Sequence, residues 1–308
     1  MGRYILRRLL QLIPVFIGTT FIIYALVWAI PGNPFAGKCG SRGCPPTYIA
    51  EMTQQYNLDD PIYVSYFKYL GDLLTGNFGE TYSGIEVSTL IQNAYPVTLK
   101  LALIALVIEG VIGISAGVLT ALRGKGFLDS LVLASTLFLI AIPVFVTGFV
   151  LQYLLGVQLE WIDPSVSSDP GIGELILPGF VLGSLSMAYI SRLSRTSMLE
   201  NKSADYIRTA TAKGLAPRRV VGIHMLRNSL IPVVTFLGTD LGALMGGAIV
   251  TEGIFNIPGI GGLVYDAILG QEGTTVTAVV ALLVMVYLLM NLLVDVLYAA
   301  LDPRIRYD

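Results

Sequence analysis

Three acidic residues interrupt long apolar runs of this sequence. Glu109, Asp240 and Asp295 lie within runs that contain no Lys or Arg at mid-run to pair with them. An ionisable side chain in such a run is costly to bury and usually faces the interior of a helix bundle or water. Glu109 and Asp240 are therefore candidates either to line an acidic pathway for a charged solute or to pack as protonated, hydrogen-bonded side chains. Asp295 lies near the end of its run and is more consistent with an interface residue or a helix contact.

Other reactive side chains give no pattern of a catalytic, nucleotide-binding or metal centre. The single histidine, His224, has no candidate partner, and no Ser/His/Asp set or metal-ligand cluster is visible. The sequence contains no Gly-x-x-x-x-Gly-Lys-Ser/Thr run, so it has no P-loop. The glycine-rich run at 259–262 lacks the third glycine of a dinucleotide fingerprint and indicates a turn. We expect no catalytic residues, no metal site, no cofactor bound by this chain and no nucleic-acid partner.

The two cysteines, Cys39 and Cys44, lie five residues apart in a short polar stretch. That spacing lacks the paired Cys or His residues of a four-ligand zinc site. A disulfide between them is plausible only where the stretch faces an oxidising compartment.

The elements that must position these residues are membrane helices. The composition is 54% hydrophobic and only 13% charged, whereas soluble domains carry about 25% charged residues. A membrane-spanning helix needs about 20 mostly apolar residues, and backbone hydrogen bonding in lipid favours helices for runs this long. The qualifying runs are 10–30, 101–121, 131–156, 175–191, 229–251 and 276–301. We predict an all-α membrane protein with six transmembrane helices in a single domain, 1–308.

The distribution of basic residues predicts the direction of these spans. With both termini in the cytoplasm, 15 of the 19 Lys and Arg residues lie on the cytoplasmic side, as the positive-inside rule requires. The exceptions are Lys38, Arg42, Lys68 and Lys100. Residues 31–98 then form an external region, where a Cys39–Cys44 disulfide can persist, and residues 192–228 form a cytoplasmic loop.

The cytoplasmic loop contains signals for two short helices. Asp205 suits the N-cap or first turn of a helix, and Gly214 is a natural helix stop. Pro217 suits the first turn of a second helix. We expect a compact helix–glycine–helix projection that a soluble partner can grip.

This loop resembles the EAA loop of ABC importer permeases. Arg208, Thr209 and Ala210 take its first place, Gly214 takes the glycine place, and His224, Leu226 and Arg227 take the last. The run Arg-Thr-Ala-Thr-Ala-Lys-Gly at 208–214 is similar to the variant usual in the peptide-permease subgroup.

Further motifs extend the resemblance over nearly the whole chain. They are Tyr-Ile-Leu-Arg-Arg-Leu at 4–9, Pro-Gly-Asn-Pro at 31–34, the runs 58–66 and 70–79, Glu-Gly-Ile-Phe-Asn-Ile-Pro-Gly-Ile-Gly at 252–261, and Leu-Asp-Pro-Arg-Ile-Arg at 301–306. Together they identify the chain as a member of the first-type permease subunits of dipeptide/oligopeptide (or nickel) ABC importers.

The resemblance implies a type I ABC importer permease fold in the lipid of the cytoplasmic (inner) membrane of a prokaryote. A second homologous permease completes the pathway, two ATP-binding subunits carry ATP and Mg, and an external solute-binding protein delivers the solute. The implied ATPase-coupling residues are Asp205, Arg208, Thr209, Ala210, Lys213, Gly214, Leu226 and Arg227. Peptides are the expected solutes; nickel or another small solute is the alternative. A secondary transporter would show inverted repeats, and no repeat stands out.

Two surfaces have competing interpretations. Gly238, Gly242 and Gly246 recur every four residues in the fifth run, and small residues at such spacing let helices approach closely. We favour packing against the second permease over packing within this chain.

The external region is rich in aromatic residues, and an interfacial belt is slightly favoured there over docking of the binding protein. These residues are Tyr56, Tyr63, Tyr66, Phe67 and Tyr69.

Overall fold

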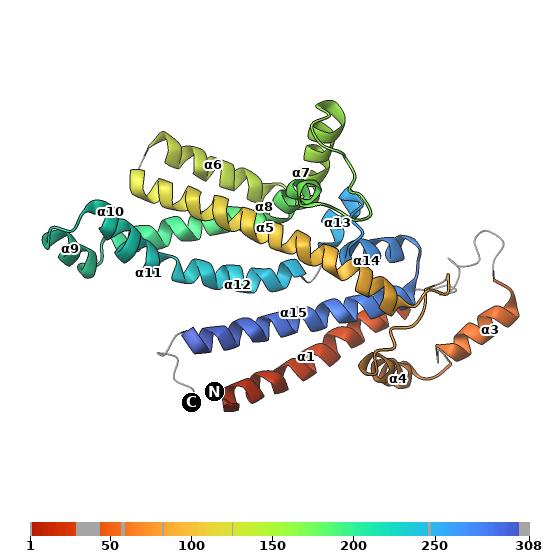
Figure 1. Ribbon diagram of the computed structural model, residues 1–308. Helices are drawn as coiled ribbons and strands as arrows, with labels where there is room; N and C mark the ends of the chain where they lie inside the picture. Colours follow the sequence, from red (N-terminus) through yellow and green to blue (C-terminus); the bar gives the residue numbers. More distant parts are fainter. Residues whose placement is uncertain are drawn as a thin grey trace. The chain divides into compact units, whose positions relative to one another are not determined.

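The computed structural model describes residues 2–28, 44–56, 59–81, 83–124, 126–245 and 248–301. Its regular secondary structure is helical throughout these residues, apart from one isolated β-bridge between Glu80 and Glu86 (Figure 1). The chain divides into two compact units. The first comprises residues 1–99 and 245–308, and the second comprises residues 100–244.

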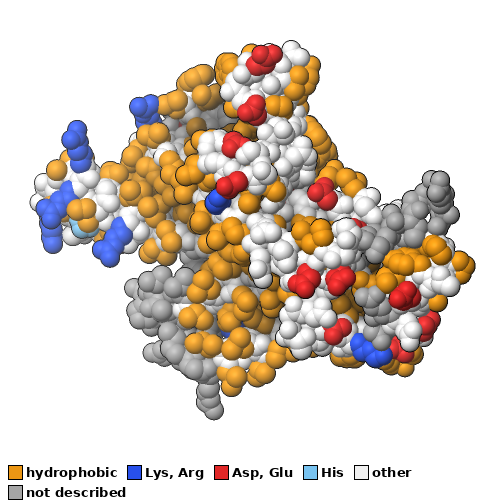
Figure 2. Space-filling view, turned by 45° about the vertical axis from the view of Figure 1, so that its right-hand side comes forward, with side chains coloured by type: hydrophobic (Ala, Val, Ile, Leu, Met, Phe, Trp, Pro, Cys, Tyr) orange, Lys and Arg blue, Asp and Glu red, His pale blue; other side chains and the backbone are white. Residues whose placement is uncertain are grey.

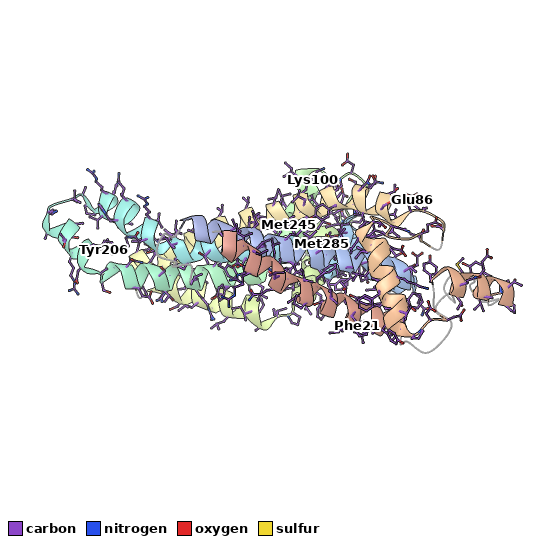
Figure 3. The ribbon with its side chains drawn as sticks, turned by 90° about the horizontal axis from the view of Figure 1, so that it is seen from below. Phe21, Glu86, Lys100, Tyr206, Met245 and Met285 are labelled. Atoms are coloured by element: carbon purple, nitrogen blue, oxygen red, sulfur yellow. The ribbon has the colours of Figure 1, made fainter. Side chains whose placement is uncertain are left out.

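The first unit is built on two long apolar helices that pack side by side, α1 and α15 (Figures 1 and 3). Its helices are α1 (Gly2–Trp28), α3 (Pro46–Gln55), α4 (Ile62–Leu74), the start of α5 (Val87–Arg123), α13 (Ile249–Phe255), α14 (Ile260–Leu269) and α15 (Gly273–Leu301). A core of buried apolar side chains joins α5, α14 and α15. Its members are Val87, Ala94, Ile260, Val264, Ala278, Val279 and Leu283.

Helix α4 lies against α1 through aromatic side chains. The Tyr66 hydroxyl donates to the Ile17 carbonyl at 2.9 Å and lies 2.7 Å from Thr20 Oγ1. Tyr66 is 1% exposed, whereas Tyr63 and Phe67 are 60% and 61% exposed. The predicted aromatic belt therefore has a buried part and an exposed part: Tyr66 lies on the face of α4 that packs on α1, and Tyr63 and Phe67 lie on the exposed face.

The second unit contains the rest of α5 and the helices up to α12. These are α6 (Phe127–Ala141), α7 (Val144–Leu151), the π-helix η2 (Gln152–Gln158), α8 (Ile172–Lys202), α9 (Asp205–Ala212), α10 (Pro217–Arg219), the π-helix η3 (Val220–Leu226), α11 (Arg227–Ser229) and α12 (Ile231–Met245). Helix α5 packs very closely on α8. A Cβ added at Gly113 would lie 2.8 Å from Ile190 Cγ2, and one at Gly117 would lie 2.6 Å from Ser194 Cβ. These two glycines are packing residues.

Four helices are long and apolar enough to cross a membrane: Ile5–Trp28, Val87–Arg123, Ile172–Lys202 and Gly273–Val296. They contain or overlap the predicted runs 10–30, 101–121, 175–191 and 276–301. Two bent pairs raise the number to as many as six, since each pair can be one span by length and composition. Helix α5 begins at Val87, so it is longer at its start than the predicted run.

The other two predicted spans are broken. The run 131–156 is bent by 103° between Phe127–Ala141 and Val144–Gln158. Pro143 causes this break, because proline lacks an N–H and disfavours the helical conformation of the residue before it; Ile142 is extended. The run 229–251 is divided among α11, α12 and α13, and the helices before and after Leu230, Pro217–Ser229 and Ile231–Met245, are bent by 43°.

Candidate functional site

Residues 203–229 form a folded segment that projects beyond the end of α8, hereafter the projecting segment (Figure 1). Its inner face is apolar and packs on the ends of α5 and α8. The buried residues of this cluster are Ala121, Met198, Ile207, Ala210, Val220 and Met225. The buried Ser229 hydroxyl lies 3.2 Å from the Ser197 carbonyl and 2.8 Å from the Met225 carbonyl, within hydrogen-bonding distance of both. The segment is therefore fixed to the second unit by a core of its own.

The turn within the projecting segment depends on Gly214. Asp205 lies in the first turn of α9, after Ala204 as N-cap, and α9 ends at Ala212. Gly214 has a φ of 73°, a left-handed conformation that glycine adopts without the steric cost of a Cβ. Pro217 then opens α10. The predicted helix–glycine–helix pattern is confirmed, with the second helix built from α10, η3 and α11.

The predicted coupling residues divide between the two faces of this segment. Ala210 is buried and Leu226 packs against the same cluster. The outer face is exposed and basic, as Figure 2 shows by the Lys and Arg side chains gathered there, and Tyr206 lies near its tip (Figure 3). Its exposed predicted residues are Asp205, Arg208, Thr209, Lys213, Gly214 and Arg227. One face thus holds the segment and the other is free to meet a partner.

The two mid-span acids are neighbours in the second unit. Glu109 on α5 and Asp240 on α12 lie close enough for their carboxyl groups to interact. Glu109 is fully buried and also contacts α8, where a Cβ at Gly183 would lie 3.1 Å from Glu109 Oε2. Asp240 is partly exposed. Sequence spacing did not predict this pairing, because 131 positions separate the two acids.

Asp295 on α15 forms an ion pair with Arg8 on α1, at 3.3 Å between Oδ2 and Nη1. The helix contact predicted for Asp295 is confirmed.

Gly242 is buried and Gly238 is half-buried in α12, whereas Gly246 lies outside the described residues. Cys39 also lies outside them, so the Cys39–Cys44 disulfide stays a prediction.

A buried carboxylate that the sequence did not single out, Glu252, organises the turn between α13 and α14. It accepts hydrogen bonds from Thr98 Oγ1 at 2.9 Å and from the Gly262 N–H at 2.8 Å. Thr98 Oγ1 in turn accepts from the Ile260 N–H at 2.8 Å. Burial raises the pKa of Glu252 from 4.5 to about 7, and these hydrogen bonds oppose that rise. Glu252 and Thr98 together cap the amino end of α14, and Thr98 connects that end to α5.

Glycines in the same motif make this arrangement possible. A Cβ at Gly259 would lie 2.5 Å from Thr98 Oγ1, and one at Gly261 would lie 2.8 Å from the Ile249 backbone. The turn predicted for the glycine-rich run at 259–262 lies in this motif, at 252–261. Its glycines and single acid at fixed spacing were the signal for a tightly packed turn.

The structure has the features of an integral membrane protein: several helices are long and apolar enough to cross a membrane, and a basic segment projects from the second unit. Residues 113–307 match the family described as binding-protein-dependent transport system inner membrane component, and residues 1–102 match the family of its N-terminal part. The chain belongs to this family. It is a transport subunit of the inner membrane, not an enzyme.

Relatives of the chain match it over its full length. It is 38% identical to the di/tripeptide transport system permease protein DppB of Pseudomonas aeruginosa, over 99% of each chain. It is 35% identical to the dipeptide transport system permease protein DppB of Escherichia coli K12, over 100% of this chain and 99% of the relative. It is also 35% identical to the oligopeptide transport system permease protein AppB of Bacillus subtilis, over 100% of both.

Proposed function

We propose that this chain is the permease subunit of an ATP-driven importer of di- and oligopeptides and forms half of the translocation pathway. The observation that carries this proposal is the full-length similarity to three permease proteins whose names specify di/tripeptide, dipeptide and oligopeptide transport. Nickel or another small solute is the alternative cargo, and the uptake measurement below separates the two.

The topology in this proposal has six spans with both termini in the cytoplasm. Residues 31–98 are external and 192–228 are cytoplasmic, within a single permease domain over 1–308. The distribution of basic residues supports this direction,. The bent pair Phe127–Ala141 and Val144–Gln158 then counts as one span, and the fifth span begins with α12, after the cytoplasmic loop.

The outer face of the projecting segment couples the chain to ATP hydrolysis. An ATP-binding subunit, with ATP and Mg, contacts the exposed residues Asp205, Arg208, Thr209, Lys213 and Arg227, while Ala210, Gly214 and Leu226 maintain the shape that is gripped. The apolar cluster beneath supports this role, because a segment fixed to α5 and α8 can transmit a push to those helices.

The remaining site residues belong to the membrane part. Asp240, with Glu109 behind it, faces the pathway and attracts the amino terminus of a peptide. Gly238, Gly242 and Gly246 pack against a second, homologous permease. An external solute-binding protein delivers the peptide, and a second ATP-binding subunit completes the complex.

Copurification and uptake test this function together. A tagged chain extracted from its native membrane is expected to bring down a sibling permease and two ATP-binding subunits, and cells lacking the chain are expected to lose uptake of labelled dipeptide but not of nickel. Loss of nickel uptake with unchanged uptake of dipeptide would show that the cargo is nickel and not peptides. Purification as a single chain that transports with an ion gradient would overturn the proposal.

A further inference from the structure

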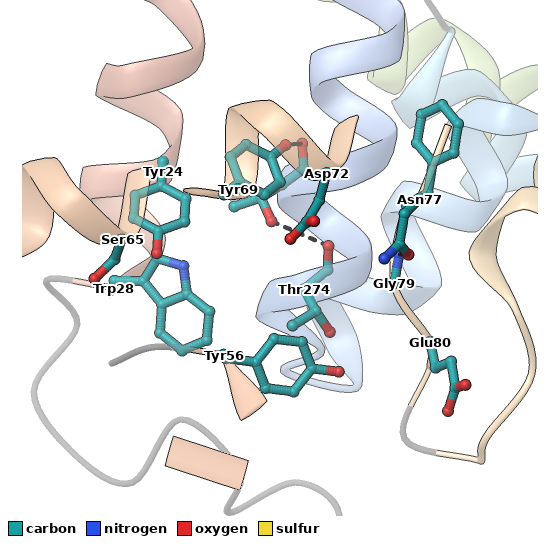
Figure 4. A pocket seen from close by; sticks show the side chains of 12 residues that line it. Tyr24, Trp28, Tyr56, Ser65, Tyr69, Asp72, Asn77, Gly79, Glu80 and Thr274 are labelled. Atoms are coloured by element: carbon teal, nitrogen blue, oxygen red, sulfur yellow. Dashed lines mark hydrogen bonds between the residues drawn. The ribbon is translucent and has the colours of Figure 1, made fainter. Parts of the chain in front are cut away.

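The first unit contains an open cavity of about 210 Å³ lined by residues of α1, α4, α15 and the segment that follows α4 (Figure 4). One water molecule needs about 10–15 Å³ by the same measure, so the cavity has room for a side-chain-sized group. All of its lining residues belong to this unit. It is therefore a feature of the unit by itself.

Aromatic rings form one wall of the cavity. The rings of Tyr24 and Tyr69 are stacked with centroids 5.2 Å apart, and Trp28 lies 6.0 Å from Tyr24. The Tyr69 hydroxyl donates to the Thr277 carbonyl at 2.9 Å, which fixes its ring between α4 and α15. Burial raises the pKa of Tyr69, so this hydroxyl stays protonated. Faces of Tyr and Trp attract cations through the ring quadrupole.

Two carboxylates give the cavity its charge. Asp72 on α4 and Glu80 after it line the cavity and are solvent-accessible, and no Lys or Arg is among the lining residues that the structure describes. These described lining residues carry two negative charges and no positive charge, which favours a positively charged occupant.

A buried hydroxyl in the lining needs a hydrogen-bond partner. Thr274 is 8% exposed, and its Oγ1 makes no hydrogen bond within the part of the chain that the structure describes. Buried polar atoms are nearly always hydrogen-bonded, and a threonine hydroxyl accepts readily from an N–H donor. Figure 4 shows Thr274 beside the aromatic and acidic side chains. A ligand with a cationic N–H group meets all three features at once.

We propose that this cavity binds the primary ammonium or guanidinium group of a basic amino-acid side chain. The stem lies along Tyr24, Trp28 and Tyr69, the charged head faces Asp72 and Glu80, and one N–H donates to Thr274 Oγ1. This site shares no residue with the projecting segment or with the Glu109–Asp240 pair, and its ligand binding does not depend on which solute is transported.

The test uses Trp28 as a reporter. The sequence has two tryptophans, so the Trp161→Phe chain, in nanodiscs with its copurifying subunits, retains Trp28 alone in this chain. Subtracting the spectrum of the Trp28→Phe/Trp161→Phe chain removes the signal of the other subunits. The probe is Nα-acetyl-lysine amide, and Nα-acetyl-norleucine amide is the neutral control of similar shape. A saturable change in Trp28 emission is expected with the lysine probe only.

Matched variants identify the groups that bind. Asp72→Asn, Glu80→Gln and Thr274→Val are each expected to weaken binding of the lysine probe at least about tenfold, and high salt is expected to weaken it further. Glu86→Gln is the control, because Glu86 pairs across the β-bridge with Glu80 yet does not line this cavity. An equal response to the norleucine probe, no saturable response, or equal effects of Glu80→Gln and Glu86→Gln would each overturn the proposal.

One further arm identifies the source of the side chain, and only this arm rests on the proposed function. If a solute-binding protein supplies the basic side chain, the lysine probe competes with its docking and Asp72→Asn weakens that docking. If free basic peptides supply it, docking is unchanged and lysine-containing dipeptides bind as the probe does. Either result retains the cation site.

Discussion

At the scale of single residues, the Thr98 hydroxyl connects two buried polar groups, the Glu252 carboxylate and the Ile260 N–H. It donates to Glu252 and accepts from the Ile260 N–H, and Thr98 is 1% exposed. Water cannot easily replace it at so buried a position. The cost of losing this group is therefore the cost of leaving a buried donor and a carboxylate short of a partner.

Thr98→Val is expected to destabilise the protein by about 1–3 kcal/mol, since valine keeps the shape and removes only the hydroxyl. The measurement is the thermal unfolding midpoint of the purified chain in detergent. Thr120→Val is the matched control, because Thr120 is also buried in α5 but its hydroxyl bonds only to carbonyls of its own helix. Equal midpoints for the two variants would show that the Glu252 network does not stabilise the fold.

At the scale of elements, the projecting segment combines a fixed core with a free outer face. Its position on α5 and α8 depends on the buried cluster, and its outer shape depends on the turn at Gly214. Changing the turn should therefore alter what a partner grips without removing the helices from the membrane.

Gly214→Val is expected to uncouple transport from ATP hydrolysis while the chain still inserts in the membrane. A β-branched residue at a φ of 73° is strained, with a left-handed cost of about 1–2 kcal/mol,, and the turn must shift to relieve it. Uptake and ATPase rates in proteoliposomes measure the effect. Gly222→Val is the control, because Gly222 lies in the same segment, lacks a positive φ and has no atom within 4 Å of an added Cβ. Normal uptake by the Gly214→Val variant would show that this turn is not needed for coupling.

At the scale of the whole molecule, the proposed direction in the membrane places Ser203 and Ser83 on opposite sides. Both residues are exposed, so each can be labelled when replaced by cysteine. In a background lacking Cys39 and Cys44, a membrane-impermeant maleimide added to intact cells is expected to label Ser83→Cys at once. Ser203→Cys should react only after permeabilisation. The reverse pattern would invert the proposed topology.

Local signals in the sequence determined much of the helical architecture. Long apolar runs predicted α1, α8, α15 and most of α5, because a lipid-facing helix must be apolar along its length. Gly214 and Pro217 predicted the turn of the projecting segment, since their backbone preferences are local. Basic residues supplied a direction, and motifs from Tyr4 to Arg306 supplied the resemblance to the family that the comparisons confirmed.

The tertiary structure alone decided which distant residues meet. Glu109 adjoins Asp240, Thr98 bonds Glu252, and Thr274 lines a cavity with Tyr24 and Asp72. It also decided that the run containing Pro143 bends by 103° rather than spanning straight. Helical periodicity specifies a face of one helix but not the helix that covers it, so such contacts depend on packing between elements far apart in the chain. Glu109 and Asp240, which are far apart in the sequence, are neighbours in the folded protein.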